Sequence, residues 1–222
     1  IHRNPMGGRN FEYFSEDPLV AGRMSAGIVA GAKSEGLITT IKHFVLNEQE
    51  SHRNGIFTWA DEQTLREIYL KAFKIPVKEG GSDGIMSAYN RLGTDWCGGC
   101  SELLKDLLRE EWGFDGFVVT DWASANEMIA HGFAEDNKHA AELSLNAGVD
   151  MDMMSYAFID HLEELVNEGK VSVEAIDNAV RNILRIKVRL GLFEHPYVDV
   201  AKAETALYSE EALEAARVSA VE

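Results

Sequence analysis

Short apolar segments of strand length alternate along the chain with stretches whose apolar residues follow a helical spacing. The segments that predict strands occupy residues 39–46, 84–90, 116–122 and 148–153. They are apolar on both faces, and the third, GFVVTDW, is rich in the β-branched residues that favour a pleated sheet. Buried strands that alternate with helices are typical of a parallel sheet. The pattern therefore predicts the α/β fold class.

The helical spacing predicts five helices. The first begins at Asp61 and the second at Ser101, and the other three cover residues 140–145, 157–166 and 173–190. In the first of them the apolar residues recur every three or four positions, at Leu65, Ile68, Tyr69, Ala72 and Phe73. Ser101 and Ser172 are expected to cap the second and the fifth helix, because a serine oxygen can accept a hydrogen bond from a free helix N–H.

Polar side chains stand at or just past the carboxyl end of every predicted strand: Lys42 and His43, Tyr89 and Asn90, Asp121, and Asp150 with Asp152. In a (β/α)8 barrel these ends converge on one mouth, where the chemistry is done. A doubly wound sheet would spread them along an edge and carry a glycine-rich phosphate loop after its first strand, and the sequence has no such loop. We therefore predict the later half of a (β/α)8 TIM-type barrel.

Four strands are too few to close a barrel, and their edges would be exposed. The chain also opens at IHRNPMGG, without an initiator methionine. We therefore expect it to be a fragment of a larger multidomain polypeptide. Residues 1–200 are predicted to hold about four barrel strands with their helices, and residues 201–222 to begin a linker or helix towards a further domain.

Composition and charge exclude several classes of function. With 45 % hydrophobic and 26 % charged residues, the chain is ordinary for a globular protein. Its net charge of −16 argues against binding to nucleic acids or to an anionic membrane surface, and no apolar run is long enough to span a bilayer. The two cysteines, Cys97 and Cys100 of CGGC, lack the second pair that a zinc site needs. We interpret them as free thiols or a local disulfide rather than as a redox motif.

Asp121 is the main candidate for chemistry, because it directly follows the buried residues 117–120. An aspartate here can be the N-cap of a following helix. It can also be a carboxylate in the barrel mouth that attacks a sugar anomeric carbon or stabilises an oxocarbenium-like transition state. Trp122 is then either a stacking platform for a sugar or a core residue. Tyr89 either orients the carboxylate or packs at a strand end.

Four cations are candidates for the same mouth. Lys42 and His43 are hard to bury unless one of them reaches solvent, whereas Arg9 and Arg53 can be plain surface residues. Around Asp121, such cations would keep the carboxylate ionised and donate hydrogen bonds to hydroxyl groups.

Four motifs occur in order along the chain: GRNFEYFSEDP, KHFVLNEQESHR, MSAYN and WGFDGFVVTDW. Together they resemble glycoside hydrolase family 3, the β-glucosidase family, over nearly the whole chain, and LGLFEHPYVD looks like that family's exit from the barrel domain. The resemblance implies that Asp121 is the catalytic nucleophile and that Tyr89 stands beside it. It implies that sugar hydroxyls in the catalytic subsite are bound by Arg9, Lys42, His43 and Arg53.

The activity implied by the resemblance is that of a retaining, exo-acting β-glucosidase that forms a covalent glycosyl-enzyme on Asp121, with no metal or cofactor. Its substrate would be a small β-glucoside or an oligosaccharide. The alternatives are a β-xylosidase of the same family, a sugar-binding module without catalysis, and an unrelated metal-dependent barrel that uses His43, Asp121 and Asp150. The compartment and the oligomeric state stay open.

Two parts of the family's machinery are expected outside this sequence. One is an aspartate from an early barrel strand, before Ile1, and the other is the acid/base glutamate of an α/β sandwich domain, after Glu222. The local carboxylates Glu12, Glu16, Glu48 and Glu50 give no reason to be assigned as the acid/base. We therefore expect the chain alone to be inactive and to need the early strands and the sandwich domain as partners.

Overall fold

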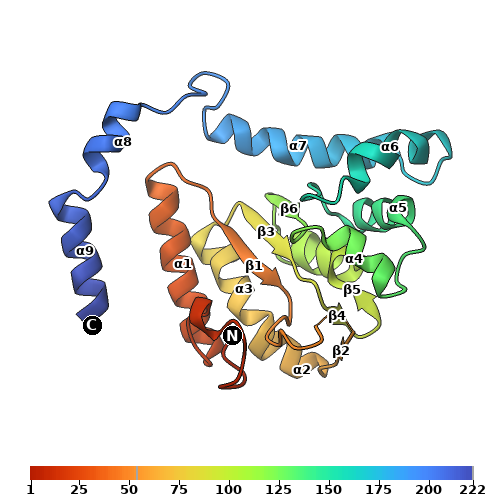
Figure 1. Cartoon of the computed structure of the whole chain (residues 1–222), viewed down its shortest axis with the longest axis horizontal. Coiled ribbons are helices and arrows are strands. Elements are labelled where there is room, and N and C mark those ends of the chain that lie inside the picture. The colour runs from red at the N-terminus through yellow and green to blue at the C-terminus, as the bar shows by residue number, and fades with distance from the viewer. Residues whose placement is uncertain (54, 222) are drawn as a thin grey trace. The chain divides into compact units, whose positions relative to one another are not determined.

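The computed structural model describes residues 1–53 and 55–221. It divides into two compact units, Ile1–Ile186 and Lys187–Glu222. The first unit holds the strands of the described chain and the helices that cover them (Figure 1). The second unit begins within a long helix and continues into two shorter ones, α8 (Val200–Ala206) and α9 (Glu210–Val221). No helix in the described residues is long and apolar enough to cross a membrane.

A parallel sheet lies at the centre of the first unit. Its strands are β1 (Thr40–Phe44), β3 (Gly84–Ser87) and β6 (Phe117–Val119), in the order β1-β3-β6. Ile41, Ile85 and Val118 stand in register across the three strands. The predicted parallel α/β sheet is therefore confirmed.

The fourth predicted strand, residues 148–153, is reduced to one bridge between Val119 and Met151. The backbone runs beside β6, and the Met151 N–H donates to the Val118 carbonyl. The Val118 N–H, however, donates to the Asp150 side chain at 2.7 Å. A carboxylate thus takes a donor that a regular ladder would use, so the prediction of a full strand was wrong.

Besides two short 3-10 turns, the helices that begin in the first unit are α1 (Pro18–Ser34), the continuous helical run of α2 (Glu62–Thr64), η2 (Leu65–Tyr69), α3 (Lys71–Ile75) and η3 (Pro76–Gly80), then η5 (Glu102–Glu111), α4 (Ser124–Ala130), α5 (Asn137–Ala147), α6 (Ala157–Asn167) and α7 (Val173–Arg189). All five predicted helices are among them. Helices α1 and α4 were not predicted. Helix α1 packs against α3 (Figure 1).

One of the two predicted serine caps is present. The Ser172 hydroxyl accepts a hydrogen bond from the Ala175 N–H at 3.1 Å at the start of α7. Ser101 has a helical backbone, with φ −64° and ψ −39°, and its side chain makes no capping hydrogen bond. An N-cap side chain reaches the helix N–H groups from a non-helical backbone, so the prediction for Ser101 was wrong.

A second, smaller sheet follows the carboxyl ends of β1 and β3. It consists of β2 (Phe57–Thr58), β4 (Arg91–Leu92) and β5 (Asp95–Trp96), in the order β2-β4-β5. Strand β4 begins shortly after β3 ends, so this sheet borders the end of the central sheet where the candidate site lies.

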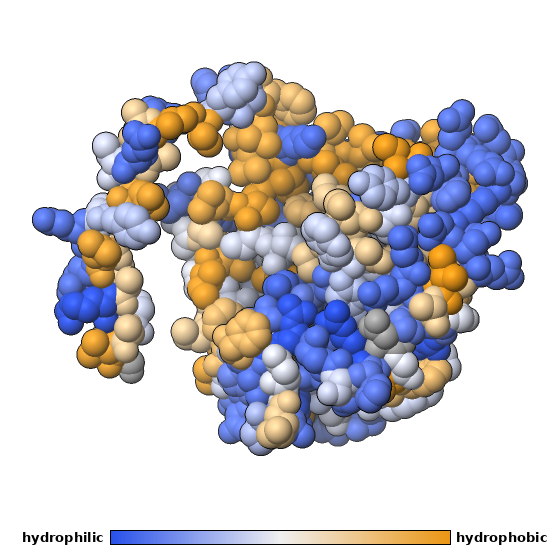
Figure 2. All heavy atoms as spheres, in the orientation of Figure 1, coloured by the Kyte–Doolittle hydropathy of each residue, from blue (hydrophilic) through white to orange (hydrophobic). Residues whose placement is uncertain are grey.

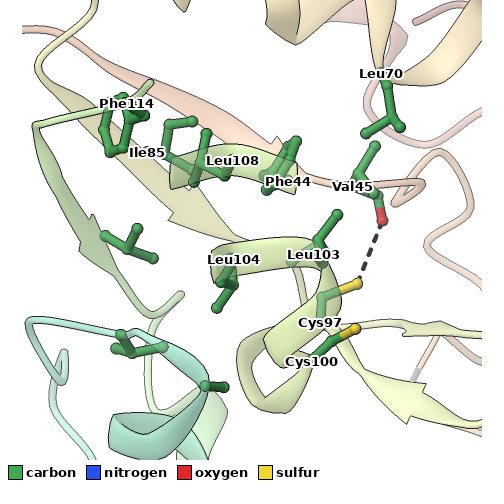
Figure 3. Packing of buried hydrophobic residues seen from close by; sticks show 14 of the residues in the cluster. Phe44, Val45, Leu70, Ile85, Cys97, Cys100, Leu103, Leu104, Leu108 and Phe114 are labelled. Atoms are coloured by element: carbon green, nitrogen blue, oxygen red, sulfur yellow. Dashed lines mark hydrogen bonds between the residues drawn. The ribbon is translucent and has the colours of Figure 1, made fainter. Parts of the chain in front are cut away.

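The main core packs the central sheet against η5 (Figure 3). Phe44 and Ile85 of the sheet meet Leu104 and Leu108 of the helix, and all four side chains are fully buried. Cys97 and Cys100 are free thiols in this core. The Cys97 thiol points at the Val45 carbonyl at 3.6 Å, and burial raises its pKa to about 12. Cys97 therefore packs as a small apolar residue.

Candidate active site

The carboxyl ends of the three central strands bring predicted site residues together. His43 lies on β1, Tyr89 follows β3, and Asp121 follows β6. The His43 Nε2 and Asp121 Oδ2 atoms are 3.4 Å apart, and the Tyr89 hydroxyl donates a hydrogen bond to the Trp122 carbonyl. Residues that are distant in sequence therefore meet where the parallel strands end.

The Asp121 carboxylate is buried and only partly hydrogen-bonded. The residue is 8 % exposed, and its Oδ1 atom accepts a hydrogen bond from the Trp122 N–H at 2.7 Å. Its Oδ2 atom faces His43 and has no hydrogen-bond partner among the described residues. Helix α4 has Ala123 at its N-cap position and no side-chain cap. The alternative that Asp121 caps this helix is therefore wrong.

The imidazole of His43 is neutral in this environment. Burial lowers its pKa to about 3, helped by the positive charges of Arg9 and Lys42. Neither ring nitrogen has a hydrogen-bond partner in the part of the chain that the structure describes. A neutral imidazole can donate from one nitrogen and accept at the other, so His43 can hold a ligand hydroxyl beside Asp121 without adding a charge.

The other predicted cations lie in one chain of ion pairs, which we call the ion-pair series: Lys42, Glu12, Arg9, Glu50 and Arg53. The Lys42 Nζ and Glu12 Oε2 atoms are 3.2 Å apart, and the other Glu12 oxygen accepts from Arg9 Nε. Glu50 follows, with 3.9 Å to Arg9 Nη1 and 2.8 Å to Arg53 Nη1. Three cations against two carboxylates leave the series net positive by one charge.

Glu12 is an ionised member of this series. Burial alone would raise the pKa of its carboxyl, but hydrogen bonds from Arg9 and Lys42 outweigh burial and hold that pKa below its usual value. Glu12 is therefore an acceptor that fixes two cations rather than a proton donor.

The ion-pair series ends on the aromatic ring of Tyr89. The Arg53 guanidinium lies 4.2 Å from the ring centroid, a distance typical of a cation–π contact. Burial, together with the charges of Asp121 and Glu127, raises the pKa of Tyr89 above its usual value, so the phenol stays protonated and can donate. Its hydroxyl donates a hydrogen bond to the Trp122 carbonyl.

Trp122 itself is 58 % exposed. The alternative that it is a core residue is therefore wrong. Asn90, the polar residue after Tyr89, is buried and donates to the Val45 carbonyl at 3.0 Å. Asn90 thus ties the loop after β1 to the end of β3.

Asp150 and Asp152 do not join this group. The Asp150 carboxylate pairs with Arg109 of η5 and accepts from Asn182 of α7 at 2.9 Å, and Asp152 bonds to Ser155. The prediction that Asp150 lines the mouth was wrong, because Arg109 and Asn182 from neighbouring helices hold its carboxylate. Asp150 is therefore not available as a ligand in the metal-dependent alternative. Within residues 1–53 and 55–221, no group of three or more His, Cys, Asp or Glu side chains could hold a metal ion.

Several buried polar atoms at the site have no partner among the described side chains: both ring nitrogens of His43, both amide atoms of Asn47, Glu50 Oε1 and Asp121 Oδ2. Buried polar groups are nearly always hydrogen-bonded, because an orphaned one costs about 1–3 kcal/mol. Both hydrogen-bond donors and hydrogen-bond acceptors are among these atoms, and the His43 ring lies beside the Asp121 carboxylate. Such an arrangement suits a neutral ligand rich in hydroxyl groups.

Glu12 and Glu50 were not predicted from the sequence to be partners of the site cations. Each stands three residues from an arginine, in Arg9-x-x-Glu12 and Glu50-x-x-Arg53. That spacing is the available signal, since both pairs form in the structure.

A parallel α/β sheet with a carboxylate, a neutral histidine and cations at its carboxyl end is typical of an enzyme that acts on a polar small molecule. The family model described as the glycosyl hydrolase family 3 N terminal domain matches residues 1–186. The chain belongs to glycosyl hydrolase family 3.

Relatives in this family carry different names. The chain is 39 % identical over 206 residues to beta-glucosidase B of Emericella nidulans, covering 91 % of this chain and 23 % of that protein. It is 38 % identical over 184 residues to an exo-alpha-(1->6)-L-arabinopyranosidase of Bifidobacterium breve, covering 83 % and 23 %. The structure of beta-glucosidase 3B from Thermotoga neapolitana in complex with glucose is similar with a TM-score of 0.76 at 42 % identity, covering 85 % of this chain and 26 % of that one. The chain thus spans about a quarter of the length of these proteins.

Proposed function

We propose that the chain carries the nucleophile of a retaining, exo-acting β-glucosidase that hydrolyses terminal β-D-glucosyl residues. The observation that supports this most is the Asp121 carboxylate, buried at the end of β6 with Oδ2 directed at a neutral histidine and free of internal hydrogen bonds in the described chain. A nucleophilic carboxylate needs an oxygen that is not already committed as an acceptor.

In this proposal the sheet is part of a (β/α)8 barrel completed by further strands. The outer edge of β1 pairs with no other strand in the described residues. Beside it a cavity of about 380 Å³ is lined by β1 and by α1 residues such as Ile28 and Val29. Helix α7 exposes Val173, Val180 and Leu184, and Figure 2 shows apolar atoms over this helix. Exposed apolar surfaces and free sheet edges are both expected to be covered.

The proposed reaction has two steps. Asp121 Oδ2 attacks the anomeric carbon as the bond to the leaving oxygen breaks, and a proton donor protonates that oxygen. Water then attacks the glycosyl-enzyme, gives up a proton to the same group, and releases the sugar with retained configuration. Arg9, Lys42, His43 and Arg53 bind the sugar hydroxyls, and Trp122 stacks on the sugar.

The proton donor is proposed to lie outside this chain, on an α/β sandwich domain. Two local carboxylates of the site are already engaged in ion pairs: Glu12 with Arg9 and Lys42, and Glu50 with Arg53. A retaining enzyme places its two carboxyl groups about 5–5.5 Å apart. Residues 1–222 alone should therefore show negligible cellobiose hydrolysis, because an alkoxide leaving group needs a general acid worth about 10²- to 10⁴-fold. Robust cellobiose turnover by this segment alone would overturn the two-domain proposal.

The test of the function is to assay the full-length protein on 4-nitrophenyl β-D-glucoside, β-D-xyloside and α-L-arabinopyranoside. The proposal expects the glucoside to have the highest kcat/KM and NMR to show β-glucose as the first product. Preference for the xyloside would favour the β-xylosidase alternative, and preference for the arabinopyranoside would match the Bifidobacterium relative's name. Binding of glucose without turnover of any of the three substrates would favour the alternative of a sugar-binding module without catalysis.

A further inference from the structure

We propose that Glu50 is a positioning residue that holds Arg9 and Arg53 in register for the sugar. This inference rests on the proposed function, because it concerns a residue that supports the sugar-binding arginines of the same site. Glu50 would not touch the substrate's reacting atoms. It would act by fixing two cations that come from separate segments of the chain.

The contacts place Glu50 between these two arginines. One carboxylate oxygen lies 2.8 Å from Arg53 Nη1, and the other lies 3.9 Å from Arg9 Nη1. Arg9 precedes the short helix η1 (Asn10–Glu12), whereas Arg53 lies in the loop after β1. Glu50 is thus the bridge through which the ion-pair series passes from one segment to the other.

The side chain of Glu50 fits beside the backbone because residue 8 is a glycine. A Cβ placed on Gly8 would lie 2.8 Å from Glu50 Cγ and 3.0 Å from Glu50 Cβ. The stem of Glu50 therefore packs directly against the Gly8 backbone. Contact on the stem and ion pairs on the head together restrict the carboxylate to one position, as a positioning group requires.

The bridge leads to the strand that carries the proposed nucleophile. Arg53 stacks on the ring of Tyr89 at 4.2 Å, and Tyr89 donates to the carbonyl of Trp122, the neighbour of Asp121. Without Glu50, Arg9 and Arg53 would repel each other and lose their shared anchor. A shift of about 1 Å in groups that position a substrate can cost about 100-fold in rate.

The geometry also separates this role from that of a general acid. Glu50 accepts a hydrogen bond from Arg53 through one carboxylate oxygen, and its other oxygen lies 3.9 Å from Arg9 Nη1. A general acid mutant keeps its activity on substrates whose leaving group needs no proton, and azide restores its second step. A positioning mutant loses activity on all substrates alike, and azide has no effect.

The experiment compares Glu50→Gln with Glu50→Asp and with the control Glu16→Gln in the full-length protein. Glu16 is exposed and its substitution removes the same charge. For Glu50→Gln we expect kcat/KM to fall about 10- to 100-fold on both 4-nitrophenyl and 2,4-dinitrophenyl β-D-glucoside. Glucose binding should weaken in parallel, and the melting temperature should stay close to that of the Glu16→Gln control. Glu50→Asp, which keeps the charge on a shorter stem, should recover part of the loss.

A double-mutant cycle with Arg53→Met identifies the pathway. If Glu50 acts through Arg53, Glu50→Gln should cost much less in the Arg53→Met background than in the wild type. Additive losses, unchanged kcat/KM, or azide rescue would overturn the inference, and in each case wild-type turnover would leave the proposed function intact. Conversely, weaker glucose binding by Glu50→Gln in a protein without turnover would support the positioning role and reject the glucosidase.

Discussion

His43 Nε2 and Asp121 Oδ2 lie 3.4 Å apart although β3 separates their strands in the sheet. Neighbouring strands are spaced by roughly 4.8 Å, so β1 and β6 are about twice that distance apart. The two side chains therefore lean towards each other over the end of β3. A site built across three strands depends on the sheet keeping its order, and small changes in any of the three should be felt at Asp121.

The first prediction concerns the pH dependence of stability at His43. Its folded pKa of about 3 lies below the usual 6.5, so between these values the unfolded chain binds a proton that the folded chain does not. Stability should therefore fall as the pH is lowered through this window, by up to about 1.4 kcal/mol per pH unit. Unfolding curves from pH 7 to 4 should show a shallower slope for His43→Gln. The control His195→Gln, at an exposed position, should keep the wild-type slope, and equal slopes for both variants would contradict a neutral His43.

The second prediction concerns Tyr89→Phe. This change removes the donor of the hydrogen bond to the Trp122 carbonyl and keeps the ring under Arg53. The free energy of unfolding should fall by about 1 kcal/mol, whereas kcat/KM should fall more than the stability loss accounts for, because Trp122 adjoins Asp121. The exposed Tyr197→Phe serves as the control. Wild-type kinetics in Tyr89→Phe would show that this bond does not position the nucleophile.

The third prediction separates Asp150 from the site. Asp150→Asn keeps the shape but leaves the partly buried Arg109 without its counter-charge. We expect the free energy of unfolding to fall by about 3 kcal/mol, with KM close to the wild-type value at temperatures where the variant is folded. The measurements are urea unfolding and steady-state kinetics. Loss of turnover at unchanged stability would instead place Asp150 in the catalytic machinery.

Much of the fold could be predicted because its signals are local. The β-branched run before Asp121 and the helical spacing after Asp61 both form the expected elements. Helix α4 escaped prediction because Ala123 enters it with a positive φ and no capping side chain. Helix α1 did carry a signal, since Asp17 caps it directly before Pro18.

The meeting of strand-end residues was predictable from the sequence, but the orientation of their side chains was not. Polar residues that follow an apolar segment indicate which side chains stand at a strand end, and His43 and Asp121 meet there in the structure. This pattern does not say which way a side chain past the strand end will turn. Asp150 turned to Arg109 because an arginine from η5 and a free N–H of Val118 offered better partners than the mouth. Such choices depend on tertiary neighbours, which spacing along the chain does not reveal.

The central claim is that Asp121 is the nucleophile, and trapping it covalently is the most direct test. The full-length protein should be inactivated by a 2-deoxy-2-fluoro-β-D-glucoside with a good leaving group, because the fluorine slows release of the glycosyl-enzyme more than its formation. Asp121→Ala should keep the fold nearly intact, lose almost all turnover and fail to label. Peptide mapping by mass spectrometry is predicted to find the fluoroglucosyl group on Asp121. A label on any other residue would contradict the account.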